Sequence, residues 1–253
     1  MTFYNNLKYD LKSDLYKLIH TPLWLIHIVI PVIGIVLFLW YYSFSQWDER
    51  NKLSAYIQAL SVTFPVLIGI ITSVLAETEQ KAGEFQLLLT ANSKYIPHIS
   101  KLIVLILFGF TSALLALVGF GVGFIGMGYT TFDLLFYVEA AILLLISVLP
   151  LYLLQYIVSF LFGKGFGVGL GIVGGLLCAL LITGLGDGLW WFLPWGIPAR
   201  FSESLLLSSL ANMEFLQYNA IMKSVIFILL FSLAFIALLI LRFNKWEGRK
   251  SED

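Results

Sequence analysis

The sequence predicts an all-α integral membrane protein with six transmembrane helices. Of its 253 residues, 60% are hydrophobic and 12% are charged, whereas soluble domains are roughly 45–50% apolar and about 25% charged. A helix needs about 20 apolar residues to cross a bilayer, and six runs are long enough. They cover residues 22–44, 54–76, 100–126, 134–160, 165–186 and 223–243.

We expect a single membrane domain over residues 1–253, made of an interfacial elbow helix (1–21), the six-span bundle (22–243) and a cytoplasmic tail (244–253). No short apolar core with a small-residue cleavage site begins the chain, so no cleavable signal peptide is expected. The tail NKWEGRKSED is short and charged. Any ATPase or sensor domain is therefore expected on another chain. The net charge of zero gives no basic field for nucleic acid.

The distribution of basic residues predicts the orientation. With the N-terminus inside, the cytoplasmic segments hold eleven of the 15 lysine and arginine residues, and the outer segments hold Arg50, Lys52, Arg200 and Lys223. Lysine and arginine near span ends favour the cytoplasmic side. We therefore expect both termini in the cytoplasm.

The first twenty residues have the pattern of an amphipathic helix. Leu7, Leu11, Leu15 and Leu18 recur at helical spacing, while lysines occupy other faces. Such a helix typically lies in the membrane interface as an elbow before the first span. The alternative is a cytosolic helix packed on another subunit.

Glycine is concentrated in two stretches, 119–128 and 163–175. Gly119 with Gly123, and Gly167 with Gly171, have the four-residue spacing that lets helices approach closely. The alternative, a phosphate-binding loop, needs a preceding strand and a soluble setting, and the sequence shows neither.

The longest polar segment predicted on the cytoplasmic side, residues 76–101, carries the clearest functional signal. Glu77 and Glu79 leave the second span, and a break at Gly83 is followed by a short helix with an apolar stripe that includes Phe85 and Leu88. A short amphipathic helix at the membrane surface is suited to dock in a partner's groove.

This segment resembles the first cytoplasmic loop of type-2 ABC exporter permeases. In that family, the loop has an acidic Glu-x-Glu element, a glycine and a Leu-Leu pair that precede a basic residue. The matching residues of this chain are Glu77, Glu79, Gly83, Leu88, Leu89 and Lys94. The run Gly83-Glu84-Phe85-Gln86 further resembles the lantibiotic-immunity branch of that family. Two departures are Ser93, where many relatives carry proline, and Lys94, where arginine is more usual.

The resemblance implies a permease subunit of an exporter that removes lantibiotics or similar peptides from the bacterial plasma membrane. Its implied partners are an ABC ATPase dimer, which holds ATP and Mg²⁺, and a second, unlike permease, although a homodimer stays open. No cofactor is expected in this chain. The residues implied to couple to the ATPase are Glu77, Glu79, Gly83, Phe85, Gln86 and Leu88, with Phe85 and Leu88 as docking anchors. Glu77 and Glu79 would meet basic residues on the ATPase or the elbow helix, or else be solvated charges.

Three polar residues within the spans are candidates for the substrate side. Glu139 stands alone about five positions into the fourth span, and an ionisable group in hydrocarbon indicates function. It would otherwise lie at the interface or pair with a basic residue of a partner subunit. Gln155 and His27 are either ligand-binding or, as is more common, engaged in interhelical hydrogen bonds.

The last outer loop contains WWFLPWGIPARF, residues 190–201. Trp190, Trp191 and Trp195 are typical of an aromatic belt at the headgroup level. The aromatic belt is the favoured interpretation, and the alternatives are a surface that grips an amphipathic peptide or a short re-entrant element.

The sequence shows no nucleophile–base pair, no paired acids within the spans and no cluster of metal ligands. We therefore expect a chain that is not an enzyme by itself. Rival functions are export of another cargo, such as a bacitracin-like antibiotic or a lipid, and a membrane scaffold without transport.

Overall fold

The computed structural model describes residues 3–200, 204 and 215–249, and the regular structure in these ranges is entirely helical. Six of the helices are long and apolar enough to cross a membrane, which confirms the predicted fold class. The elements are α1 (Phe3–Ile19), α2 (Leu23–Tyr42), α3 (Glu49–Lys81), α4 (Gln86–Leu89), α5 (Tyr95–Gly126), α6 (Leu134–Phe162), α7 (Lys164–Ile182), η1 (Gly184–Gly186), η2 (Trp190–Phe192) and α9 (Phe215–Asn244).

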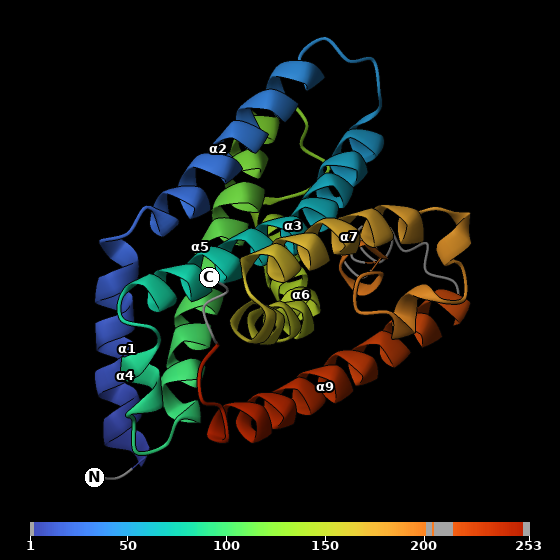
Figure 1. The fold of residues 1–253 in the computed structure, drawn as a ribbon. Helices are drawn as coiled ribbons and strands as arrows, with labels where there is room; N and C mark the ends of the chain where they lie inside the picture. The colour runs from blue at the N-terminus through green and yellow to red at the C-terminus, as the bar shows by residue number, and fades with distance from the viewer. Residues whose placement is uncertain (1–2, 201–203, 205–214, 250–253) are drawn as a thin grey trace.

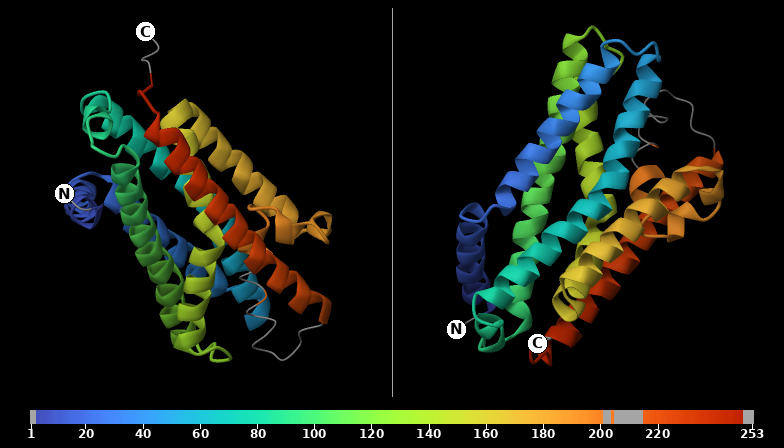
Figure 2. Two further views of the ribbon diagram at one scale, coloured as in Figure 1. Left: turned by 90° about the horizontal axis from the view of Figure 1, so that it is seen from below. Right: turned by 45° about the horizontal axis from the view of Figure 1, so that its top comes forward.

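Helices α3, α5 and α6 form the centre of the bundle, with α2 against α5, α7 against α3 and α9 against α6. Figure 1 shows the short α4 beside α1 and the adjoining ends of α3 and α5. The right view of Figure 2 places the beginning of α1, the α4 turn and the end of α9 at one end of the bundle. We call this the α4 end. The α2–α3 and α5–α6 connections lie at the opposite end.

The ends of several spans differ from the predicted ones. Helix α3 has 33 residues, because its polar first and last turns continue the helix instead of forming loops. Its Lys52 is buried, and the ammonium donates to the Tyr42 carbonyl oxygen at 3.1 Å and to the Tyr129 hydroxyl. Helix α7 ends at Ile182, before the predicted 186, because a 3₁₀ turn begins at Gly184.

The glycines bring helices together as predicted. A β-carbon on Gly69 of α3 would lie 2.8 Å from the Gly167 carbonyl oxygen and 2.8 Å from the Gly171 α-carbon of α7. Only glycine permits that approach. On α5, Gly119 and Gly123 receive leucine and isoleucine side chains of α2. Both pairs therefore serve helix packing.

Helix α1 packs on α5 through part of its apolar stripe. Leu18 is buried and Leu11 is partly buried against the core, while Leu15 remains 42% exposed and Ile19 48% exposed. The helix is present where the amphipathic pattern indicated one. Its position in the membrane interface stays a prediction, as do the single domain over 1–253 and its three parts.

Candidate functional site

The turn between α3 and α4 has an unusual backbone. Gly83, Glu84 and Phe85 have φ angles of 139°, 48° and 66°, and a left-handed conformation costs about 1–2 kcal/mol for each residue that is not glycine. Backbone hydrogen bonds close the turn: the Glu84 amide donates to the Gln80 carbonyl at 2.7 Å, and the Gln86 amide to the Gly83 carbonyl at 2.9 Å. Such a conformation persists only where the surroundings hold it.

The Phe85 side chain provides that hold. It is 1% exposed, and its ring centroid lies 4.9 Å from that of Trp246, beyond α9, and 6.2 Å from that of Phe160 in α6. Leu88 is also buried. The expectation that Phe85 and Leu88 are docking anchors is therefore corrected, because both side chains fasten the turn to its own bundle and are not accessible to a partner.

A different set of side chains points outward from the same turn. Glu84 and Gln86 are exposed, and Leu87 is 67% exposed. The alternation has a simple cause, since the one-turn helix α4 directs Phe85 and Leu88 toward the bundle and leaves Leu87 on the opposite side. The turn thus presents one apolar and two polar side chains to its surroundings.

The segment after α9 packs against this turn, which the sequence analysis did not foresee. The Lys94 ammonium donates to the Trp246 carbonyl oxygen at 2.9 Å. The Arg249 guanidinium donates to the Gln80 side-chain oxygen and, at 3.4 Å, to the Ser159 carbonyl oxygen. The available signal was Trp246, a large aromatic residue in an otherwise polar tail.

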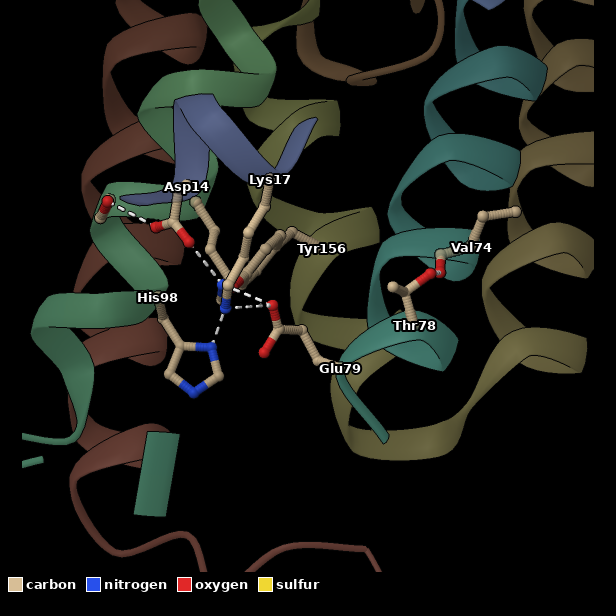
Figure 3. Close-up of polar contacts among 9 residues, drawn as sticks. Asp14, Lys17, Val74, Thr78, Glu79, His98 and Tyr156 are labelled. Carbon is tan, nitrogen blue, oxygen red and sulfur yellow. Dashed lines mark hydrogen bonds and ion pairs between the residues drawn. The ribbon is translucent and has the colours of Figure 1, made fainter. Parts of the chain in front are cut away.

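A buried ionic network joins three helices beside the turn (Figure 3). The Lys101 ammonium of α5 lies 2.6 Å from Asp14 Oδ1 of α1 and 2.7 Å from Glu79 Oε1 of α3. The Ser100 hydroxyl donates to Asp14 Oδ2 at 2.6 Å. Lys17 of α1 lies 3.5 Å from the same Glu79 oxygen. Glu79 therefore meets the N-terminal helix, as one of the expected alternatives held, and it is not a solvated charge.

Glu77 connects the end of α3 to a different neighbour. Its two carboxylate oxygens lie 2.8 Å from the Lys81 ammonium and 2.7 Å from the Lys164 ammonium at the start of α7. The turn and its flanking acidic residues are consequently linked to α1, α5 and α7, and through Phe85 to α6 and the segment after α9.

The candidate polar residues within the spans lie apart from this turn. Glu139 is exposed on α6, on the same face as the exposed Leu135 and Ile142. Gln155 is fully buried, and neither polar atom of its amide has a partner among the described residues. His27 bonds only to the Leu23 carbonyl oxygen of its own helix, at 2.9 Å, among the residues described. The interhelical hydrogen bonds favoured for Gln155 and His27 are therefore not formed within the described part of the chain.

The tryptophans between α7 and α9 pack on neighbouring helices. The Trp191 ring centroid lies 5.4 Å from that of Phe227 in α9 and 4.9 Å from the Lys223 ammonium. Trp190 and Trp195 are partly buried, and Trp195 borders Gly174 of α7. Residue 201, which ends the predicted aromatic segment, lies outside the described residues. The structure does not bring these tryptophans together with the α3–α5 turn.

The six long apolar helices and a short structured turn at one end define a multi-pass helical membrane protein. Residues 11–182, more than half of the chain, match the profile of the ABC-2 family transporter proteins. The chain belongs to that family. No curated protein and no solved structure matches it.

Family membership makes this chain the membrane component of an ABC-2 type transporter. Permeases of the family lack an ATPase domain and pair with ABC ATPase subunits. This confirms the expectation that the chain is not an enzyme by itself and that its energy source lies on another subunit.

Proposed function

We propose that this chain is the permease subunit of an exporter that removes a lantibiotic or similar antimicrobial peptide from the bacterial plasma membrane, giving self-immunity or resistance. In this proposal the α4 end and both termini face the cytoplasm. An ATPase dimer holding ATP and Mg²⁺ docks there, and a second, unlike permease completes the membrane part.

The proposed contact with the ATPase rests on the outward face of the α3–α5 turn. Leu87 is 67% exposed between polar neighbours, and a single exposed apolar side chain on a structured turn is suited to fill a partner's groove. We assign the contact with the ATPase to Glu84, Gln86 and Leu87, while Gly83, Phe85 and Leu88 set the shape of the turn.

The ion pairs on the buried side of the turn support the proposal that a movement of the turn is passed to the neighbouring helices as a rigid-body shift. Glu79 is joined through Lys101 to α1 and α5, and Glu77 through Lys164 to α7. A displacement of the turn is thereby passed to several spans at once, as in other rigid-body transitions between packed elements.

The exposed carboxylate of Glu139 supports a cationic cargo. It lies among apolar side chains on the outside of the bundle, where a charge in hydrocarbon is costly and indicates function. A cationic amphipathic peptide arriving from the bilayer meets this face first. The partly buried Trp190, Trp191 and Trp195 offer a further aromatic surface for the apolar side of such a peptide.

The test is survival of a sensitive bacterium that expresses the chain with its neighbouring permease and ATPase. We expect wild type to protect against a lantibiotic, and Leu87→Asp to lose both protection and co-purification of the ATPase at unchanged membrane levels. Leu185→Asp is the matched control, because Leu185 is 71% exposed but lies in η1, away from the turn. It should retain the ATPase.

The outcomes separate the rival functions. An assembled, ATP-hydrolysing complex that protects against no lantibiotic would identify another cargo, such as a bacitracin-like antibiotic or a lipid. A chain that never co-purifies with an ATPase would favour a scaffold. A Leu87→Asp variant that still retains the ATPase would refute the assigned contact.

A further inference from the structure

A cavity of about 340 Å³ lies between α1, α2, α3 and α5 at the α4 end. Its size is at the lower end of ligand pockets, which hold about 300–1,000 Å³. The lining includes the buried side chains of Leu18, Leu23 and Val104 and the partly buried Leu75, whereas Tyr16, His20 and Thr78 at its edge are exposed. The cavity therefore has an apolar floor and a mouth that opens outward.

One cation at this mouth can bind a further acceptor. Lys101 is already engaged by Asp14 and Glu79 at 2.6 and 2.7 Å. Lys17 is 42% exposed, and among the described residues its ammonium is paired only with the Glu79 oxygen that Lys101 also contacts, at 3.5 Å. An ammonium group has three donors, so Lys17 can donate to an anionic group placed over the cavity.

The surroundings of the mouth are apolar. Ile19 of α1 and Trp24 and Leu25 of α2 are exposed beside it, and tryptophan in a membrane protein settles at the headgroup level. Trp24 and Leu25 belong to α2, a helix long and apolar enough to cross a membrane, so we expect them to face lipid. A bilayer lipid thus reaches the cavity laterally, without crossing water.

We infer that this cavity is a binding site for one phospholipid of the leaflet at the α4 end, with its phosphate on Lys17 and an acyl chain against Leu18, Leu75 and Val104. The charged lining of the cavity is balanced, with Lys17 and Lys101 against Asp14 and Glu79, so the contact with the phosphate rests on the exposed Lys17 alone. The inference goes beyond the proposed function and does not depend on the cargo, since the site belongs to the elbow region and not to the proposed peptide face.

The experiment is native mass spectrometry of the purified full chain titrated with phosphatidylglycerol or phosphatidylethanolamine. We expect one lipid to bind in preference to further ones. Lys17→Gln should weaken it about tenfold, the effect of losing one hydrogen bond to a charged group. Thr78→Trp should abolish it, because the indole blocks the mouth and the exposed Thr78 bonds only to its own helix.

Two matched variants control the result. Lys12→Gln removes an exposed lysine of α1 that does not line the cavity, and Thr111→Trp adds the same bulk at an exposed threonine of α5 that also bonds to its own helix. Both should bind lipid as wild type does. Lipid binding that is equal in Thr78→Trp and Thr111→Trp would overturn the site.

The lipid chemistry is tested in parallel arms. If both phospholipids bind, the phosphate is the recognised group. If only phosphatidylglycerol binds, the net negative charge of the lipid is recognised. Either result supports the site. Diacylglycerol, which has the acyl chains without a phosphate, should bind about tenfold more weakly. Diacylglycerol that binds as well as the phospholipids would refute the role of Lys17.

Discussion

Removal of the Lys101 ammonium should strongly destabilise the protein. The side chain is 3% exposed and is the nearest cation to both Asp14 and Glu79. Deleting one partner of a buried ionic network typically costs about 3–5 kcal/mol, because the remaining charges stay buried without compensation. Asp14 keeps the Ser100 hydroxyl and Glu79 keeps the more distant Lys17. We therefore expect Lys101→Met to cost about 3 kcal/mol, the lower end of that range.

For a chain of this size, that cost corresponds to a fall in melting midpoint of roughly 6–12 °C. The assay is the fraction of monodisperse protein after heating in one detergent. Lys101→Met combined with Asp14→Asn and Glu79→Gln should recover most of the loss, because these substitutions remove all three buried charges of the network. Lys81→Met, which removes a 75% exposed ammonium, should leave the midpoint unchanged. Equal midpoints for Lys101→Met and Lys81→Met would refute this account of the network.

Three further substitutions test the packing of the chain. Gly69→Leu should destabilise the protein by about 1–3 kcal/mol or more and reduce the yield of monodisperse protein, because the new side chain would meet the backbone of α7. Gly169→Leu is the control and should leave the yield unchanged, since Gly169 borders open space. Gly83→Ala, at φ 139°, should lower the melting midpoint by an amount equivalent to about 1–2 kcal/mol, and an unchanged midpoint would contradict the turn geometry. Trp246→Ala should cost about 3–5 kcal/mol and speed proteolytic cleavage near Phe85, and a cleavage rate equal to that of wild type would contradict the packing of the tail on the turn.

The spans could be predicted because they depend on local properties of the chain. Hydropathy over about 20 residues is sufficient to find a helix that crosses a bilayer, and the four-residue spacing of Gly167 and Gly171 is visible in the sequence. The start of α3 could not be predicted, since Lys52 has the character of a loop residue until its ammonium is seen to donate hydrogen bonds to the Tyr42 carbonyl oxygen and the Tyr129 hydroxyl.

The short helix after Gly83 was predicted from the sequence, but the packing of its side chains was not. The motif located the turn, yet it could not show that Phe85 faces inward, because its neighbour Trp246 lies far along the sequence. The same holds for the ionic network, whose hydrogen-bonded partners are separated by as many as 87 residues. Contacts of this kind depend on how the helices pack, and no local pattern encodes them.

The packing of Trp246 on Phe85 has a consequence for biosynthesis. Phe85 leaves the ribosome early, after two spans, but its aromatic neighbour Trp246 follows the sixth span and is synthesised much later. The α3–α5 turn therefore acquires its contact with Trp246 only after all six spans have been synthesised. An unfinished or truncated permease would present an unsupported turn, and in the proposed function it would not recruit an ATPase before the membrane part is complete.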